Sequence, residues 1–212
     1  MPVTQRKQIL GVILAGGTSR RFGSDKCAAL LGGKSMIDRV IERARPQVDE
    51  LVLNVNTETG TGPDIECLPD DGPGQGPLAG ILMGLKAAEG RGYSHLASFA
   101  CDTPFFPRDT VARLSETLYV SNADVAFVRC GPTVHRIFAV WAISSRSRLA
   151  AAFAVGARSM RSIEGWLVPA WADFLPEGGP DGDPFFNINT GAELERAENW
   201  LSQHSPNSRL QM

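Results

Sequence analysis

Short apolar runs alternate along the chain with segments in which apolar residues recur every three or four positions. A bounded apolar run is typical of a strand buried on both faces, and the longer spacing is typical of a helix. The runs predict strands at 9–15, 51–55, 65–68, 96–100, 124–129 and 134–141. The helical spacing predicts helices at 35–45, 77–85, 108–119, 147–154, 160–166 and 192–202.

The order of these elements predicts a single α/β domain. Strands that alternate with helices form a mostly parallel sheet covered on both faces, which gives three layers. No internal repeat or long linker divides the chain, so we place the domain at residues 1–203 and a flexible polar tail at 204–212.

Composition narrows the possible partners. The 212 residues are 43% hydrophobic and 21% charged, with a formal net charge of -2. This balance does not favour binding to nucleic acid or to an anionic membrane, and the apolar runs are shorter than the roughly 20 residues that span a bilayer. Any anionic ligand must therefore be held by a local group of residues.

The four cysteines, at positions 27, 67, 101 and 130, are scattered and form no C-x-x-C motif. Cysteine beside an apolar run usually serves as a small hydrophobic residue. The spacing predicts neither a zinc site nor a disulfide framework, and it favours a reducing, cytoplasmic location.

The stretch LAGGTSRRFGSDK follows the first predicted strand and combines glycines with Arg21 and Lys26. It contains neither G-x-G-x-x-G nor the Walker pattern. Glycine lets backbone N–H groups approach a ligand, and the basic residues add positive charge, as a polyphosphate requires. A flexible turn with solvated arginines explains these residues equally well.

Polar residues also lie near the ends of other predicted strands. Asp102 and Asn54 follow apolar runs, while Asn187 and Asn189 flank one isoleucine. Because parallel strands end at one edge of a sheet, we expect these side chains to converge. Asp102 could bind Mg²⁺ or cap a helix. The two asparagines could bind a metal or a phosphate, or they could form an Asx turn. His135 could contact the substrate or simply lie at the edge of a strand.

Four segments taken together resemble one enzyme family. LAGGTSRRFGSDK resembles the nucleotidyltransferase signature L-A-G-G-x-S-x-R-M-G-x-D-K, with Phe22 in place of methionine. GPLAG at 76–80, ACDTPFFP at 100–107 and FFNINT at 185–190 follow in the order of the molybdenum cofactor guanylyltransferase family. The resemblance implies a Rossmann-like, three-layer nucleotidyltransferase fold. It also implies Mg²⁺-dependent transfer of GMP from GTP to molybdopterin or the molybdenum cofactor, with release of pyrophosphate.

The same resemblance implies roles for individual residues. Lys26 and Arg21 would neutralise the GTP phosphates, and Asp102 would bind Mg²⁺ and contact the nucleotide. Asn187 and Asn189 match the family's N-x-N, beside the metal and the molybdopterin phosphate. The other expected nucleotide contacts are Leu14, Ala15, Gly16, Gly17, Asn54 and Asp70.

One position departs from the family pattern, and at another the matching residue is uncertain by one position. Arg136 stands where the pattern has a proline after histidine, on the molybdopterin side of the site. The glycine-rich loop before GPLAG leaves Asp71 as an alternative to Asp70.

Two other functions compete with guanylyl transfer. A cytidylyltransferase for the same cofactor would more typically carry L-A-A-G, so Gly16 and GPLAG favour guanine. A non-catalytic nucleotide-binding or cofactor-binding module would not need both Lys26 and Asp102. The implied partners are GTP, the cofactor, cofactor-delivery proteins and acceptor molybdoenzymes.

Overall fold

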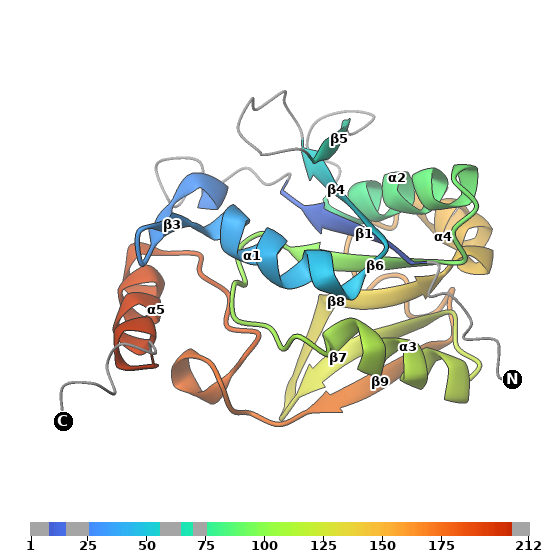
Figure 1. The fold of residues 1–212 in the computed structure, drawn as a ribbon. Helices are drawn as coiled ribbons and strands as arrows, with labels where there is room; N and C mark the ends of the chain where they lie inside the picture. The colour runs from blue at the N-terminus through green and yellow to red at the C-terminus, as the bar shows by residue number, and fades with distance from the viewer. Residues whose placement is uncertain (1–8, 16–25, 56–64, 70–75, 205–212) are drawn as a thin grey trace, which may run out of the picture.

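The computed structural model describes residues 9–15, 26–55, 65–69 and 76–204 of the chain. A seven-stranded sheet with the order β5-β4-β1-β6-β8-β7-β9 forms its centre (Figure 1). The strands are β1 (Ile9–Leu14), β4 (Glu50–Val55), β5 (Glu66–Pro69), β6 (His95–Ala100), β7 (Val125–Cys130), β8 (Thr133–Ala142) and β9 (Pro169–Phe174). Only β8 runs against its two neighbours in this sheet, β6 and β7. The predicted α/β fold with a mostly parallel sheet is therefore confirmed.

Helices cover both faces of the sheet. Helices α1 (Met36–Ala44) and α3 (Thr110–Val120) pack on one face, and α2 (Pro77–Gly90) and α4 (Arg146–Ala154) pack on the other (Figure 1). The short 3₁₀ turns are η1 (Lys26–Ala28), η2 (Arg45–Gln47), η3 (Ile143–Ser145) and η4 (Pro180–Gly182). Among the described residues, no helix is long and apolar enough to cross a membrane.

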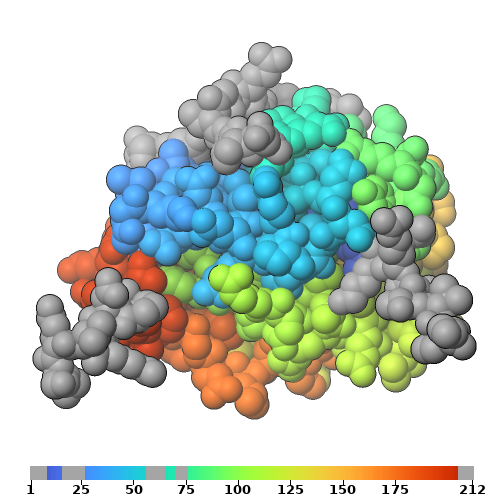
Figure 2. Space-filling model, in the orientation of Figure 1, coloured from blue at the N-terminus to red at the C-terminus, as the bar shows by residue number. Residues whose placement is uncertain are grey.

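A third, smaller core lies under helix α5 (Gly191–His204), which packs beside the hairpin of β2 (Leu30–Leu31) and β3 (Lys34–Ser35). Figure 2 shows α5 in red next to the blue segment that carries this hairpin. Buried Ile188 joins the same core, so the segment just before α5 is fixed by packing. His204 ends α5, and the rest of the expected tail lies outside the described residues.

Local sequence accounts for the starts of two helices. The Ser35 hydroxyl accepts a hydrogen bond from the Asp38 N–H at 3.2 Å and caps α1. Pro77 is the first residue of α2, where its missing N–H costs nothing. Gly76 precedes it at φ +74°, a conformation that residues with a Cβ rarely adopt.

The helix predicted at 160–166 is wrong. This segment forms successive turns, in which the Ser162 N–H bonds to the Ser159 carbonyl and the Trp166 N–H bonds to the Ile163 carbonyl. The Ser159 hydroxyl also accepts a bond from the Ser162 N–H, and such side-chain bonds compete with an α-helix. Three-residue turns bury Met160 and Ile163 at a spacing that resembles a helix in sequence.

Strand β9 and the β2–β3 hairpin are absent from the sequence prediction. Along β9, buried Ala170, Ala172 and Phe174 alternate with exposed Trp171 and Asp173, which is a period-two signal. The hairpin has only two residues in each strand, too few to produce a recognisable pattern. Phe174 at the end of β9 packs against Phe185, and the hairpin packs with α5.

Candidate functional site

The ends of β1, β4 and β6 meet at one edge of the sheet. Leu14 pairs with Asn54 on one side and with Ala100 on the other. Beyond these pairs, the Ala15 N–H donates to the Asn54 carbonyl at 2.9 Å, and the Cys101 N–H donates to the Leu14 carbonyl at 3.3 Å. The predicted convergence of strand ends is confirmed for these residues.

Asp102 and the N-x-N segment lie together at this edge. The Ile188 N–H donates to the Asp102 carbonyl at 2.9 Å. The two residues are far apart in the sequence, and this bond belongs to no helix or strand pair. Ile188 is fully buried, whereas Asn187 and Asn189 on either side of it are exposed. This alternation leaves both asparagine side chains outside the core, beside the Asp102 backbone.

The local contacts of Asp102 separate its candidate roles. It is half-buried in the turn that follows β6, and its Oδ1 accepts a hydrogen bond from the Thr103 hydroxyl at 3.2 Å. Helix α3 begins only at Thr110 and has Asp109 at its N-cap position. Asp102 therefore does not cap that helix, although its carboxylate takes part in the turn that follows β6.

A capping interaction fixes the N-x-N segment to α5, and the sequence analysis did not identify it. The Glu193 carboxylate accepts bonds from the Asn189 N–H at 2.7 Å and from the Thr190 hydroxyl at 3.0 Å. The Glu193 N–H donates to the Thr190 hydroxyl at 3.3 Å, completing a capping box whose T-x-x-E signal is present in the sequence. Burial opposes ionisation of Glu193, but these hydrogen bonds outweigh it and lower its pKa.

A second carboxylate supports the other end of this loop. Asp183 Oδ1 accepts the Phe185 N–H at 2.8 Å, and Asp183 Oδ2 lies 3.2 Å from His135 Nε2. The His135 ring also lies 5.2 Å from the Phe185 ring. Burial opposes ionisation of Asp183, but His135 and the Phe185 N–H outweigh it and lower the pKa of this carboxyl. His135 thus contacts the loop that carries the two asparagines.

Asn54 is buried, with only 3% of its surface exposed to solvent. Its Nδ2 donates to the Leu68 carbonyl at 3.1 Å, which links β4 to β5. A Cβ on Gly80 would collide with Asn54 Oδ1 and would lie 2.8 Å from Leu14 Cδ2. The GPLAG segment therefore packs directly behind the ends of β1 and β4.

Arg136, the departure from the family pattern, is engaged in a partly buried ion pair. Its Nε lies 2.6 Å from Glu164 Oε1, on the turn segment that replaces the predicted helix. This pair ties β8 to that segment. A Cβ on Gly76 would lie 3.1 Å from the Arg158 carbonyl, so the same segment also approaches the start of α2.

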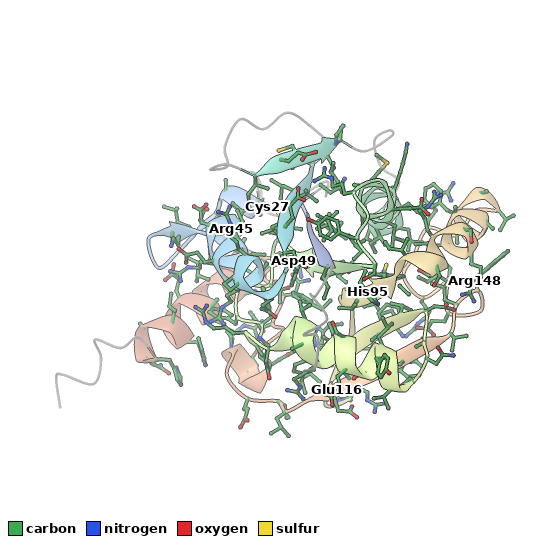
Figure 3. All side chains as sticks on the ribbon, turned by 45° about the vertical axis from the view of Figure 1, so that its right-hand side comes forward. Cys27, Arg45, Asp49, His95, Glu116 and Arg148 are labelled. Carbon is green, nitrogen blue, oxygen red and sulfur yellow. A yellow bond between two sulfur atoms is a disulfide. The ribbon has the colours of Figure 1, made fainter. Side chains whose placement is uncertain are left out.

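The cysteines differ from the sequence expectation. Cys27 in η1 and Cys101 after β6 form a disulfide, with Cα atoms 5.9 Å apart. Cys67 is exposed and Cys130 is buried, both as free thiols. The sequence could not predict the pair because 74 positions separate its members, which only the folded chain brings together. His95 begins β6, at the opposite edge of the sheet from Cys27 (Figure 3).

The remaining predicted site residues are only partly described. Leu14 and Ala15 are half-buried at the end of β1, and Lys26 is the first residue of η1. Gly16, Gly17, Arg21, Asp70 and its alternative Asp71 lie outside the described residues. Among the described residues, no group of three histidine, cysteine, aspartate or glutamate side chains gathers as a preformed metal site.

A central sheet of this topology, with polar groups converging where β1, β4 and β6 end, defines a nucleotidyltransferase. Residues 11–170 match the MobA-like NTP transferase domain. The chain is 39% identical to the molybdenum cofactor guanylyltransferase of Rhizobium meliloti (strain 1021) over 198 residues, 90% of each protein. It is 38% identical to that of Rhodobacter capsulatus over 203 residues, which cover 94% of this chain and 100% of the relative. The protein belongs to the molybdenum cofactor guanylyltransferase family.

A solved structure agrees with this assignment. The crystal structure of molybdopterin-guanine dinucleotide biosynthesis protein A from Archaeoglobus fulgidus is similar to this fold with a TM-score of 0.73 and 26% sequence identity. The match covers 92% of this chain and 99% of that one. The similarity therefore extends over most of both chains.

Proposed function

We propose that this protein transfers GMP from GTP to the terminal phosphate of molybdopterin or of the molybdenum cofactor, in a Mg²⁺-dependent reaction that releases pyrophosphate. The names of its relatives support the two substrates. The hydrogen bond from the Ile188 N–H to the Asp102 carbonyl carries the proposal for this chain. It holds the backbone of Asp102, the predicted metal ligand, beside the segment that carries the predicted cofactor-side asparagines.

The nucleotide side of the proposed site begins at Leu14 and Ala15. The loop after β1 would surround the triphosphate with backbone N–H groups, and Arg21 and Lys26 would balance its charge. Asn54 and Asp70 would contribute on the nucleoside side. The close packing of Gly80 on Leu14 and Asn54 supports a rigid wall behind the nucleotide.

The residues at this edge fit a magnesium ion that arrives with its nucleotide. Mg²⁺ is commonly held by one or two carboxylates together with substrate phosphate oxygens, and Asp102 is half-buried beside the exposed asparagines. When bound, the ion would offset negative charge on the phosphates and their leaving group. Asp102 would supply its carboxylate, and Asn187 and Asn189 would orient the acceptor phosphate.

The chemistry asks for positioning more than for a strong base. An oxygen of the cofactor phosphate attacks the α-phosphorus of GTP, and the bond from that phosphorus to the bridging oxygen of pyrophosphate breaks. A phosphate nucleophile is already ionised near neutral pH, so no histidine has to remove its proton. Lys26 would stabilise charge on the departing pyrophosphate, which is the main electrostatic demand of the step.

The experiment that tests this proposal is a product assay. The purified protein is incubated with Mg²⁺, molybdopterin or its molybdenum-loaded form, and either GTP or CTP, after which the dinucleotide products are separated. We expect a guanine dinucleotide from GTP alone. A cytosine product would contradict the guanine assignment, and the absence of both products would contradict the transferase proposal.

Asp102→Asn tests the assigned metal carboxylate, with Asp109→Asn as its matched control. Asp109 is exposed and lies at the start of α3, in the same connection after β6. We expect D102N to lower kcat by roughly 100-fold or more and D109N to stay within about twofold of the parent protein. Equal turnover by D102N and the parent would contradict a metal role for Asp102.

A further inference from the structure

The Cys27–Cys101 disulfide lies directly beside the proposed catalytic groups. Cys27 follows Lys26 in sequence and Cys101 precedes Asp102, so the bond joins the neighbours of the two residues. The Cys27 sulfur also lies 4.0 Å from the carbonyl oxygen of Ala15, at the end of β1. The disulfide thus links η1 to the turn after β6 and lies beside the end of β1, next to the residues of the proposed phosphate site.

The bond limits how far these segments can separate. Adjacent Cα atoms are about 3.8 Å apart. Because the Cα atoms of the two cysteines are 5.9 Å apart, those of Lys26 and Asp102 stay within about 14 Å of each other. A lysine side chain and an aspartate can reach the same triphosphate across such a span. The disulfide is therefore compatible with a nucleotide-bound arrangement.

The other two cysteines do not share this placement. Cys67 is exposed on β5, and Cys130 is buried at the end of β7. Burial, assisted by the nearby Asp183 charge, raises the pKa of the Cys130 thiol to about 11, which makes it a poor nucleophile near neutral pH. Exposed Cys67 can therefore serve as a control thiol that does not belong to the Cys27–Cys101 pair.

We propose that Cys27 and Cys101 form a reversible thiol–disulfide pair that tunes the affinity of the site for metal-bound GTP. This inference rests on the proposed function, because it takes Lys26 and Asp102 as the phosphate and metal groups. The oxidised pair holds Lys26 and Asp102 near the spacing that the ligand requires, so the protein loses less conformational entropy when GTP binds. The reduced pair removes the covalent link and binds GTP more weakly.

A small-molecule disulfide supplies the oxidising equivalents. The half-buried Cys27 thiol loses its proton and attacks one sulfur of the reagent, which forms a mixed disulfide and releases one thiol. The Cys101 thiol then loses its proton and attacks the Cys27 sulfur, which forms the internal bond and releases the second thiol. Two protein thiols are oxidised, one reagent disulfide is reduced, and the released protons end on the reagent thiols. In reducing compartments, disulfides of this kind are usually transient and regulatory.

The test measures pairing and binding in the same samples. Full-length protein is equilibrated with oxidised or reduced glutathione, free thiols are alkylated, and the linked peptides are identified by mass spectrometry. GTP affinity is then measured by calorimetry in the presence of Mg²⁺, without the pterin substrate. The same measurements are made on Cys27→Ser and on the control Cys67→Ser.

We expect a Cys27–Cys101 peptide in the oxidised parent protein and roughly three- to tenfold tighter GTP binding than in the reduced protein. C67S should behave like the parent, and C27S should show no redox effect on affinity. Failure to form the linkage, or equal or weaker GTP binding after it forms, would overturn the inference. Absence of GTP binding in both the oxidised and the reduced parent protein would instead count against the proposed function, since neither state of the disulfide would then support a GTP site.

Discussion

Gly80 shows how one missing side chain shapes the site. A Cβ at this position would collide with Asn54 Oδ1 and would lie 2.8 Å from Leu14 Cδ2. Asn54 is buried and hydrogen-bonded to the Leu68 carbonyl, so it cannot swing away without breaking the link to β5. A glycine lets α2 approach the ends of β1 and β4 closely.

We predict that Gly80→Ala lowers the free energy of unfolding by about 1–3 kcal/mol because the extra methyl group overpacks this contact. Gly90→Ala is the matched control in the same helix, since a Cβ there would meet nothing within 4 Å. Alanine favours a helix over glycine, so G90A should be neutral or stabilising by up to about 1 kcal/mol. Urea denaturation of both variants measures the difference, and equal stabilities would contradict the packing argument.

At the residue scale, sequence reasoning succeeded where a residue's role follows from its position at a strand end. It placed Asp102, Asn187 and Asn189 at one edge, and the Ile188–Asp102 hydrogen bond shows this proximity. Their chemical roles stay predictions. Glu193 was not predicted, although its T-x-x-E signal is present in the sequence, because two asparagines by themselves do not indicate which side chain holds them.

The loop between η4 and α5 depends on contacts from β8. His135 on β8 lies 3.2 Å from Asp183 Oδ2, and the Phe185 N–H donates to Asp183 Oδ1. At the other end of the loop, Glu193 holds Asn189. The two carboxylates therefore fix the extended segment that presents the N-x-N residues.

We predict that Asp183→Asn lowers the free energy of unfolding by about 1–2 kcal/mol near neutral pH, since it replaces the carboxylate that lies against His135 and accepts the Phe185 N–H with a neutral amide. Asp181→Asn is the control, because Asp181 is exposed in the same loop and pairs with Arg196 near the surface. Chemical denaturation should show a smaller change for D181N. A D183N protein as stable as D181N would contradict the supporting role of Asp183.

The pH dependence of this difference follows from the lowered pKa of Asp183. A lowered pKa contributes stability that is full above the ordinary value of 3.8 and is lost as the pH falls through the folded-state value. The stability gap between the parent and D183N should therefore persist from neutral pH to about 4 and narrow below it. A gap that widens in acid would contradict the assigned direction.

At the element scale, the sequence pattern located six of the seven strands of the central sheet but not all of their directions. Residues 134–141 were recognised as a strand, yet nothing in their apolar run indicates that β8 runs antiparallel to β6 and β7. The false helix at 160–166 has a related cause, since three-residue turns and helices both bury residues at similar spacing. Direction and hydrogen-bond pattern depend on partners that local sequence does not specify.

At the scale of the whole molecule, the two edges of the sheet have separate tasks. The ends of β1, β4 and β6 carry the candidate site, together with the linked Cys27 and Cys101. Long-range pairs such as this disulfide could not be predicted, because they exist only once the strand order is set. The opposite edge contains buried Asp124, just before β7, and His95 at the start of β6.

Asp124 joins several elements at that opposite edge. Its carboxylate accepts a hydrogen bond from Arg148 on α4, labelled in Figure 3, and another from the Val168 N–H at 2.8 Å. Its backbone N–H donates to the Val168 carbonyl, and its carbonyl accepts the Ala142 N–H. Asp124 therefore connects the start of β7 to the end of β8, to α4 and to the residue before β9.

We predict that Asp124→Asn lowers the free energy of unfolding by about 2–3 kcal/mol while leaving GTP affinity within about twofold of the parent protein. The amide nitrogen of asparagine would face a donor where the carboxylate accepts, which leaves one partly buried donor unpaired. Asp173→Asn is the control, because Asp173 forms an exposed pair with Arg129 that solvent screens, and it should lose less stability. Thermal unfolding and calorimetric GTP titration separate the two effects. A folded D124N protein that no longer binds GTP would contradict the division of tasks between the two edges, because Asp124 lies at the opposite end of the strands from the candidate site.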